Sequence, residues 1–181
     1  MEIEDRELVS RVLAGASSDF RVIVERHQQS VFRFALGLVG NREEAEDVTQ
    51  EAFLAAFTNL AGYDSSRAQF STWLFTIARN RCFNLLKRRR PIASHELDSI
   101  ADDSPTDPIV SQELSQQLDR ALAALPVEQR SAFVLAEIEQ LPYAEIAQID
   151  RTSIGTVKSR IHRAKQRLQS LLKPSMRESK W

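Results

Sequence analysis

The sequence predicts an all-α protein made of two small helical domains joined by a flexible linker, the second containing a helix-turn-helix. Apolar residues recur at intervals of three and four along most of the chain, the period of a helix that buries one face. Only five glycines and six prolines interrupt the 181 residues, so long helices can form. Three of those prolines lie within residues 91–112, a stretch rich in Ser and Asp without apolar periodicity, which divides the helical pattern in two.

The first domain, residues 1–92, is predicted to contain four helices. They cover residues 5–13, a longer segment that ends at Gly40, residues 42–60 and residues 71–89. Asn41, followed three residues later by Glu44, has the pattern of a capping pair that starts the third helix. Cys82 shares an apolar stripe of the fourth helix with Leu74 and Leu85, which indicates a buried structural thiol.

The second domain, residues 113–181, follows a linker at residues 93–112. Its predicted helices cover residues 112–125, 126–139, 142–149 and a last one from about 154 to 171 that Ser153 caps. Pro126 and Pro142 suit the first turn of a helix, where no intrahelical donor is needed. Ile138 and Tyr143 are assigned to the apolar core.

The net charge of −1 conceals blocks of opposite sign along the chain. Residues 65–90 carry seven basic residues and no acid, whereas every charged residue from Glu96 to Asp119 is acidic. Between Arg151 and Lys180, Glu178 is the only acid. Two basic patches on either side of an acidic connection indicate two contacts with a polyanion. The near-neutral total predicts that neither patch alone binds DNA tightly at cellular salt.

Several classes of protein are excluded by what the sequence lacks. A single cysteine rules out an intramolecular disulfide and a multi-cysteine zinc site. No clustered carboxylates, nucleophile constellation or phosphate-binding loop is present, so we expect no catalytic residue, no metal, no cofactor and no enzymatic activity. Without an 18-residue apolar run or a basic-then-apolar start, we expect no membrane insertion and a cytoplasmic location.

Residues 141–160 have the pattern of a helix-turn-helix, in which the second helix enters the major groove with its N-terminal residues against base edges. Polar residues at the start of that helix are candidates for base contacts, and two later arginines for phosphate contacts. The candidates are Thr156, Lys158, Ser159 and Arg160, followed by Arg163 and Arg167. A basic helix exposed on a small bundle is the alternative interpretation.

Longer motifs resemble one bacterial family. Residues 143–147 (YAEIA) and 155–165 (GTVKSRIHRAK) are similar to the upstream-element reader of extracytoplasmic-function (ECF) sigma factors of the sigma-70 family. Residues 45–53 (AEDVTQEAF) resemble their polymerase-binding helix, and residues 70–80 (FSTWLFTIARN) resemble the segment that opens and reads the downstream element. The motifs occur in the order and spacing of the family.

The resemblance implies a subunit that binds the β and β′ subunits of core RNA polymerase and directs initiation at duplex −35 and melted −10 promoter DNA. It implies that core polymerase contacts Asp47, Gln50, Glu51 and Leu54. It implies that −10 DNA contacts Trp73, Asn80, Asn84, Lys87 and Arg88. An anti-sigma protein is implied as a further partner, and association with the nucleoid when active.

The sequence departs from the family at the turn of the helix-turn-helix. The family has an apolar residue and then glycine, where this chain has Asp150 and Arg151. A positive φ at Arg151 would cost about 1 kcal/mol, so another path of the turn is the alternative. A second functional hypothesis is a stand-alone helix-turn-helix regulator, which would bind specific duplex DNA without polymerase.

Overall fold

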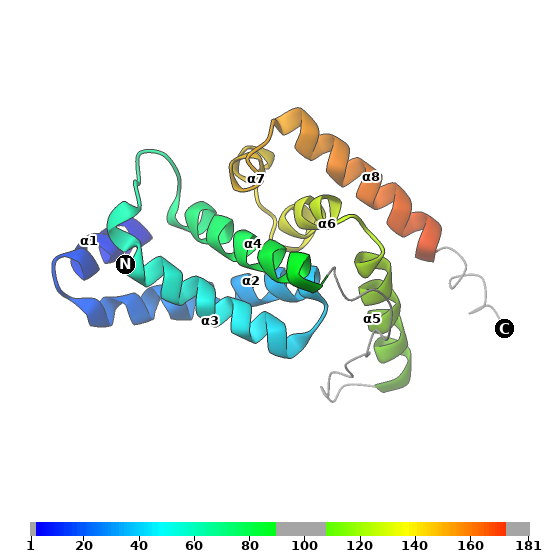
Figure 1. Cartoon of the computed structure of the whole chain (residues 1–181), viewed down its shortest axis with the longest axis horizontal. Helices are drawn as coiled ribbons and strands as arrows, with labels where there is room; N and C mark the ends of the chain where they lie inside the picture. The colour runs from blue at the N-terminus through cyan, green and yellow to red at the C-terminus, as the bar shows by residue number, and fades with distance from the viewer. Residues whose placement is uncertain (1–2, 90–107, 173–181) are drawn as a thin grey trace.

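The computed structural model describes residues 3–89 and 108–172, with side chains of the second stretch from residue 116 onward. All regular elements in these stretches are helical, which confirms the all-α prediction (Figure 1). The first domain contains α1 (Asp5–Leu13), α2 (Phe20–Val39), α3 (Arg42–Thr58) and α4 (Phe70–Arg89), with short 3-10 turns η1 (Ser17–Asp19) and η2 (Leu60–Gly62). The second contains α5 (Pro108–Ala123), α6 (Val127–Phe133), the π-helical turn η3 (Val134–Ile138), α7 (Tyr143–Ile149) and α8 (Ile154–Leu172).

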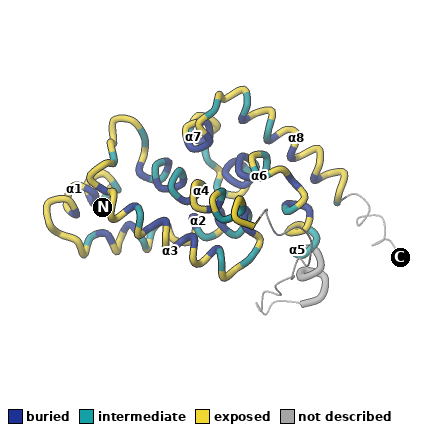
Figure 2. Tube along the Cα trace, viewed as in Figure 1, coloured by how far each residue is buried: buried dark blue, intermediate teal, exposed yellow. Residues whose placement is uncertain are grey.

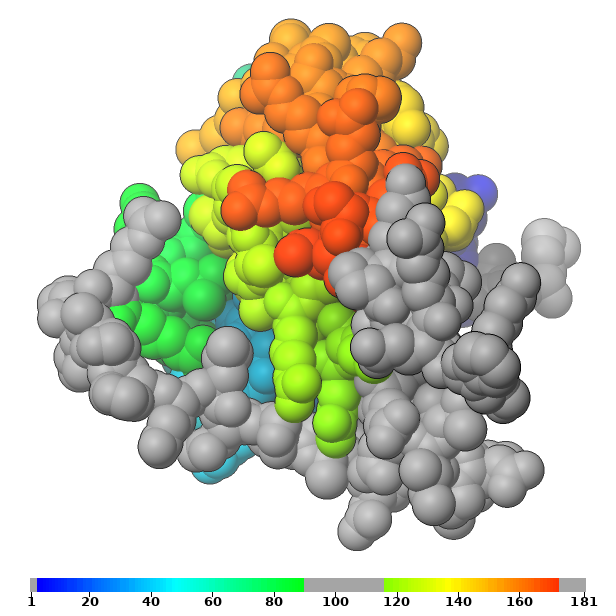
Figure 3. Space-filling model, turned by 90° about the vertical axis from the view of Figure 1, so that its right-hand side faces the viewer, coloured from blue at the N-terminus to red at the C-terminus, as the bar shows by residue number. Residues whose placement is uncertain are grey.

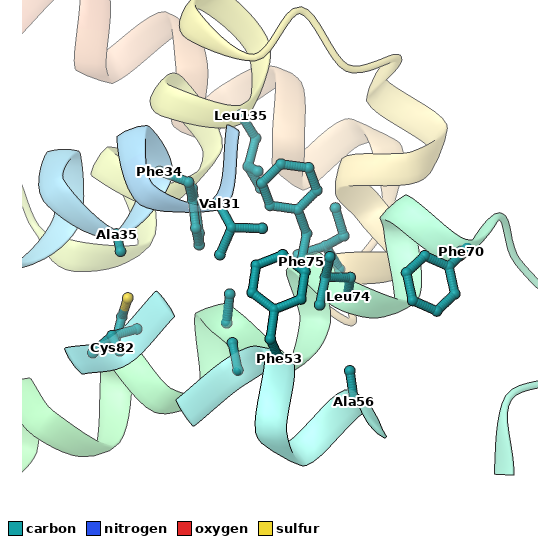
Figure 4. Close-up of a cluster of buried hydrophobic side chains, with 14 of the residues drawn as sticks. Val31, Phe34, Ala35, Phe53, Ala56, Phe70, Leu74, Phe75, Cys82 and Leu135 are labelled. Carbon is teal, nitrogen blue, oxygen red and sulfur yellow. The ribbon is translucent and has the colours of Figure 1, made fainter. Parts of the chain in front are cut away.

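Local signals in the sequence set the helix ends of the first domain. Gly40 ends α2 with a φ of 70°, which glycine adopts without steric cost. Asn41 then caps α3, because its side-chain oxygen accepts a hydrogen bond from the Glu44 amide at 3.0 Å. The helices α2, α3 and α4 pack around a core that includes Phe34, Phe53 and Phe75 (Figure 4).

Cys82 is fully buried in this core, as its place on the apolar stripe predicts. Burial raises the pKa of the Cys82 thiol to about 12, because the thiolate would lose its hydration. Since only the thiolate is nucleophilic, we expect Cys82 at pH 8 to react with a thiol reagent about 1,000-fold more slowly in the native protein than in denaturant. Equal rates, measured with a chromogenic disulfide, would contradict this burial.

The second domain differs from the prediction at three points. Helix α5 begins at Pro108, so the predicted linker was too long at its C-terminal end, and its residues 93–107 lie outside the described stretches. The predicted helix 126–139 is divided into α6 and η3. The assignments of Ile138 and Tyr143 to the core were wrong, since these side chains are 39% and 37% exposed. A π turn holds one extra residue, which shifts the face that following side chains occupy.

The two domains pack directly on each other, which the sequence did not predict. One apolar cluster includes Phe34 of α2 and both Val134 and Leu135 of η3, and Figure 4 shows Leu135 pointing toward the side chains of the first domain. Gly37 permits a close approach of the two domains, since a Cβ there would lie 3.0 Å from a methyl carbon of Val134. Figure 3 shows atoms of the second domain lying against those of the first.

Candidate polymerase and promoter interfaces

The outer side of α3 carries the four residues predicted to bind polymerase. Its inner side is buried by Ala45, Val48, Ala52, Phe53 and Ala56. Asp47, Gln50, Glu51 and Leu54 are exposed on the opposite side, and the Leu54 side chain is 67% exposed. Phe57 is 43% exposed and extends this surface by one helical turn. The result is an acidic patch with an apolar end, which suits a basic partner surface.

An ion pair crosses from this surface to α4. Arg81 donates to Glu51 at 3.2 Å, and both side chains are exposed to solvent. Exposed pairs of this kind contribute less than about 1 kcal/mol. Glu51 can therefore exchange Arg81 for another cation at little cost.

Four of the five residues predicted to contact −10 DNA share the exposed side of α4. Asn80, Asn84, Lys87 and Arg88 are exposed, and the first three follow one another at helical spacing. Figure 2 shows exposed and buried positions alternating along α4. Two amides and two cations thus form one exposed strip along the helix, a combination that suits base edges and phosphates.

Trp73, the fifth, has a different environment near the start of α4. Its ring is partly buried, with centroids 5.4 Å from Tyr63 and 5.7 Å from Phe70. The Tyr63 hydroxyl donates to the carbonyl of Ala68 at 3.1 Å, which fixes the preceding loop against the same aromatic cluster. Trp73 therefore stabilises the fold and keeps only part of its ring open to a base.

The exposed side of α8 carries most of the residues predicted to read −35 DNA. Val157, Ile161, Ala164 and Leu168 are buried on its inner side. Lys158, Ser159, Arg163 and Arg167 lie exposed on the outer side. Thr156 is half-buried, and its amide donates to the Ser153 oxygen at 3.1 Å, so Ser153 caps α8 as predicted.

The turn before α8 takes a left-handed conformation without glycine. Arg151 has a φ of 50°. Of the two paths that the sequence left open for this turn, the chain therefore takes the one with a positive φ. The amide of Arg151 donates to the carbonyl of Gln148 at 3.2 Å, and that of Thr152 to Ala147 at 2.9 Å. These two bonds are the Schellman pattern that closes a helix C-terminus. They offset the steric cost at Arg151.

Asp150, which precedes this turn, is a fully buried carboxylate with three partners on three helices. Arg79 of α4 donates to it at 2.7 Å, Ser131 of α6 at 3.2 Å and Arg160 of α8 at 3.0 Å. Arg79 was not among the predicted site residues. Arg160, predicted to read bases, points to this buried group, with its side chain 24% exposed. The sequence signal for this cluster was Asp150 itself, an acid at a position where the family has an apolar residue.

Three further polar contacts join the domains. Arg33 of α2 pairs with the buried Glu139 at 2.9 Å, and the Thr72 hydroxyl of α4 donates to Glu145 of α7 at 2.9 Å. Arg130 of α6 donates to the carbonyl of Leu38 at 2.6 Å. Burial lowers the pKa of Arg130, yet the guanidinium remains charged at neutral pH because its ordinary pKa is so high.

Neither a membrane helix nor a metal site is found in the part of the chain that the structure describes. None of the helices in residues 3–89 and 108–172 is both long and apolar enough to cross a bilayer. Within the same residues, His, Cys, Asp and Glu side chains form no group of three that could hold a metal ion.

Comparisons with known proteins match both domains. A model of sigma-70 region 2 matches residues 23–92, and a model of sigma-70 region 4 matches residues 115–168. The ECF RNA polymerase sigma factor SigW of Bacillus subtilis is 32% identical, covering 96% of this chain and 99% of that protein. The ECF RNA polymerase sigma-E factor of Escherichia coli is 34% identical, with 97% and 98% covered.

Solved structures show the same fold. The sigma factor RpoE of Bartonella quintana, in complex with the anti-sigma factor NepR, is 28% identical with a TM-score of 0.71, covering 86% of this chain and 97% of RpoE. CnrH, in complex with the cytosolic domain of CnrY, is 24% identical with a TM-score of 0.75 and coverage of 94% and 97%. The helices that carry the candidate residues thus belong to a known arrangement.

Proposed function

This chain belongs to the extracytoplasmic-function group of RNA polymerase sigma factors, and from that premise we propose which of its residues bind polymerase and promoter DNA. As a sigma factor it directs core RNA polymerase to initiate at specific promoters. The first domain is a sigma region 2 domain and not the sensor or dimerisation domain of a stand-alone regulator.

The exposed side of α3 binds core polymerase. Asp47 and Glu51 supply two negative charges that complement a basic helical surface of the β′ subunit, and Gln50 adds a neutral hydrogen-bonding group. Leu54 lies beside them with most of its surface in water, so its burial against a partner is favourable. The same residues would gain nothing from DNA, since phosphates repel both carboxylates.

The exposed strip of α4 binds the melted −10 element. Unpaired bases offer hydrogen-bonding edges to the amides of Asn80 and Asn84, while Lys87 and Arg88 neutralise backbone phosphates. Trp73 offers a partly open ring on which one base can stack. Melting is favoured because these groups bind bases only after they unpair.

The outer side of α8 binds the −35 duplex. Lys158 and Ser159 lie near the start of the helix, where they reach base edges, and Arg163 and Arg167 lie further along toward phosphates. Thr156 contributes its hydroxyl at the helix start. Arg160 gives one of its five N–H groups to Asp150 and keeps the others for a guanine edge.

One observation carries this proposal: α3, α4 and α8 each bury one side in the core and expose a separate polar surface. Run-off transcription tests this proposed function. The purified chain is mixed with bacterial core polymerase and a library of genomic promoters, and the transcripts are measured. Discrete transcripts that require the chain are expected. Equal transcription with and without the chain would overturn the proposal.

Regulation and location follow the same reasoning. The relative RpoE is known in complex with an anti-sigma factor, and we extend such control to this chain. The chain works in the cytoplasm and on the nucleoid when active, since polymerase and promoters are there. It performs no reaction itself, and the polymerase provides the catalysis.

Arg160→Ala is expected to weaken use of the −35 element by about 1–3 kcal/mol, or roughly 5- to 150-fold in relative promoter strength, because a two-bond contact to guanine is lost. Competitive transcription from matched promoters that differ only at −35 measures this effect. Unchanged selectivity would assign Arg160 to the Asp150 cluster alone.

A further inference from the structure

The Asp150 cluster joins the helix that reads −10 DNA to the helix that reads −35 DNA. The carboxylate has no exposed surface, and it accepts from Arg79 on α4 and from Arg160 on α8. We propose that Asp150 is a positioning residue that holds the second domain closed on the first in the free chain, and that Arg79 leaves it for promoter DNA when the domains separate. This inference rests on the proposed function.

The closed arrangement is too short to occupy both promoter elements. By their names the −35 and −10 elements lie about 25 base pairs apart, which is about 85 Å along B-form DNA at about 3.4 Å per base pair. In the closed chain, one carboxylate lies within hydrogen-bonding distance of both reading helices, through Arg79 and Arg160. A promoter cannot be bound at both elements until α8 has moved away from α4. The closed arrangement is therefore the resting state, and polymerase and DNA must open it.

Opening removes one partner of Asp150 and leaves two. Ser131 and Arg160 belong to the same domain as Asp150, so both remain bonded to it when the domains part. Of the three contacts that Asp150 makes, only the one with Arg79 crosses between the domains. Since a buried carboxylate is costly without its partners, loss of Arg79 must be compensated by water and by the new contacts of the open state. Removal of Arg79 therefore weakens the closed arrangement, while Asp150 keeps its hydrogen bonds to Ser131 and Arg160.

Arg79 is placed to change partners. It lies next to Asn80 in the chain, beside the exposed strip of α4. Its guanidinium stacks on the Phe83 ring, 3.9 Å from the ring centroid. Its side chain is 14% exposed in the closed chain. Separation of the domains exposes this guanidinium beside the amides that read −10 DNA, where a phosphate replaces the carboxylate. The same positive charge thus serves closure first and DNA binding afterwards.

The contact between Gly37 and Val134 offers a direct test. A Cβ at position 37 would lie 3.8 Å from the Cβ of Val134, a separation typical of disulfides. In the full-length Gly37→Cys, Val134→Cys variant we expect a disulfide to form in the free chain and to lock the domains together. If fewer than about a tenth of the molecules can still open, run-off transcription should fall about 10-fold or more. A reductant should restore it. Cys82 is buried and leaves the experiment undisturbed.

The two single-cysteine variants control for the substitutions themselves. Full activity of the oxidised double variant, or no disulfide in the free chain, would overturn the proposal. Loss of activity in the reduced variant and in the unaltered chain alike would instead argue against the sigma function, so the two failures are distinguishable.

The role of Arg79 needs a separate measurement that does not depend on activity. Small-angle X-ray scattering of the free chain should give a larger radius of gyration for Arg79→Gln than for the unaltered chain. Arg81→Gln is the matched control, because Arg81 lies on the same helix but pairs with Glu51 of its own domain. Equal radii for Arg79→Gln and Arg81→Gln would exclude Arg79 as a closing contact.

Discussion

Replacing Asp47 and Glu51 together by arginine is expected to abolish transcription directed by this chain. Both carboxylates are exposed on α3, so the fold should tolerate the exchange. At an interface, each lost charge pair costs about 2–5 kcal/mol, and reversal adds repulsion from the basic partner. Capture of core polymerase on immobilised chain should therefore fall by at least about 100-fold.

A charge reversal elsewhere in the same domain is the control. Glu25 is exposed on α2 and pairs with Arg21, much as Glu51 pairs with Arg81, so Glu25→Arg removes a similar pair from another surface. It should retain polymerase. Normal capture by the Asp47→Arg, Glu51→Arg variant, with its helical content intact by circular dichroism, would remove the polymerase contact from this side of α3.

Promoter opening is expected to fail when Asn80 and Asn84 are both replaced by alanine. Each amide is exposed, and alanine favours helices, so stability should be preserved or slightly raised. Losing hydrogen bonds to unpaired bases at about 1–1.5 kcal/mol each should lower the fraction of open complexes by about 30- to 150-fold. Permanganate footprinting of unpaired thymines on a holoenzyme-bound promoter measures that fraction.

Two controls separate melting from binding. Gln29→Ala removes an exposed amide from α2 and should leave the footprint unchanged. The double variant should also bind polymerase and −35 duplex as the unaltered chain does. A full permanganate footprint from the Asn80→Ala, Asn84→Ala variant would place the melted bases on other residues.

Helices and their exposed sides could be predicted because they depend on short-range patterns. The inner residues of α8 recur at helical spacing from Val157 to Leu168, and charged residues fill the remaining positions, so one face must be buried and the other exposed. Asn41 was predicted as a cap from its own side chain and from Glu44 three residues later, and Ser153 from its side chain and its place before the last helix. Such signals need no knowledge of the rest of the fold.

Predictions failed where backbone geometry departs from an ideal helix. The π turn η3 places one more residue per turn than the periodicity assumes, so Ile138 comes out at the surface. Pro108 begins α5, although a proline in a stretch of Ser and Asp also indicates a linker. The sequence does not distinguish these uses of proline.

Contacts between distant residues were beyond sequence reasoning. Asp150 is an acid where the family has an apolar residue, but its partner Arg79 lies 71 residues earlier in the chain. Many arginines are available to pair with an acid, and only the packing of α7 on α4 selects this one. The direct packing of the two domains was missed for the same reason.

The contact at Gly37 affects how much of this protein can bind polymerase, but it does not affect which promoters the protein selects. A methyl group there would meet a methyl carbon of Val134 at 3.0 Å, so even alanine would require the Val134 side chain to shift by a few tenths of an ångström. Neither residue faces polymerase or nucleic acid in the surfaces proposed above. Exchanges at this contact can therefore raise or lower the amount of competent subunit while leaving the set of target promoters untouched.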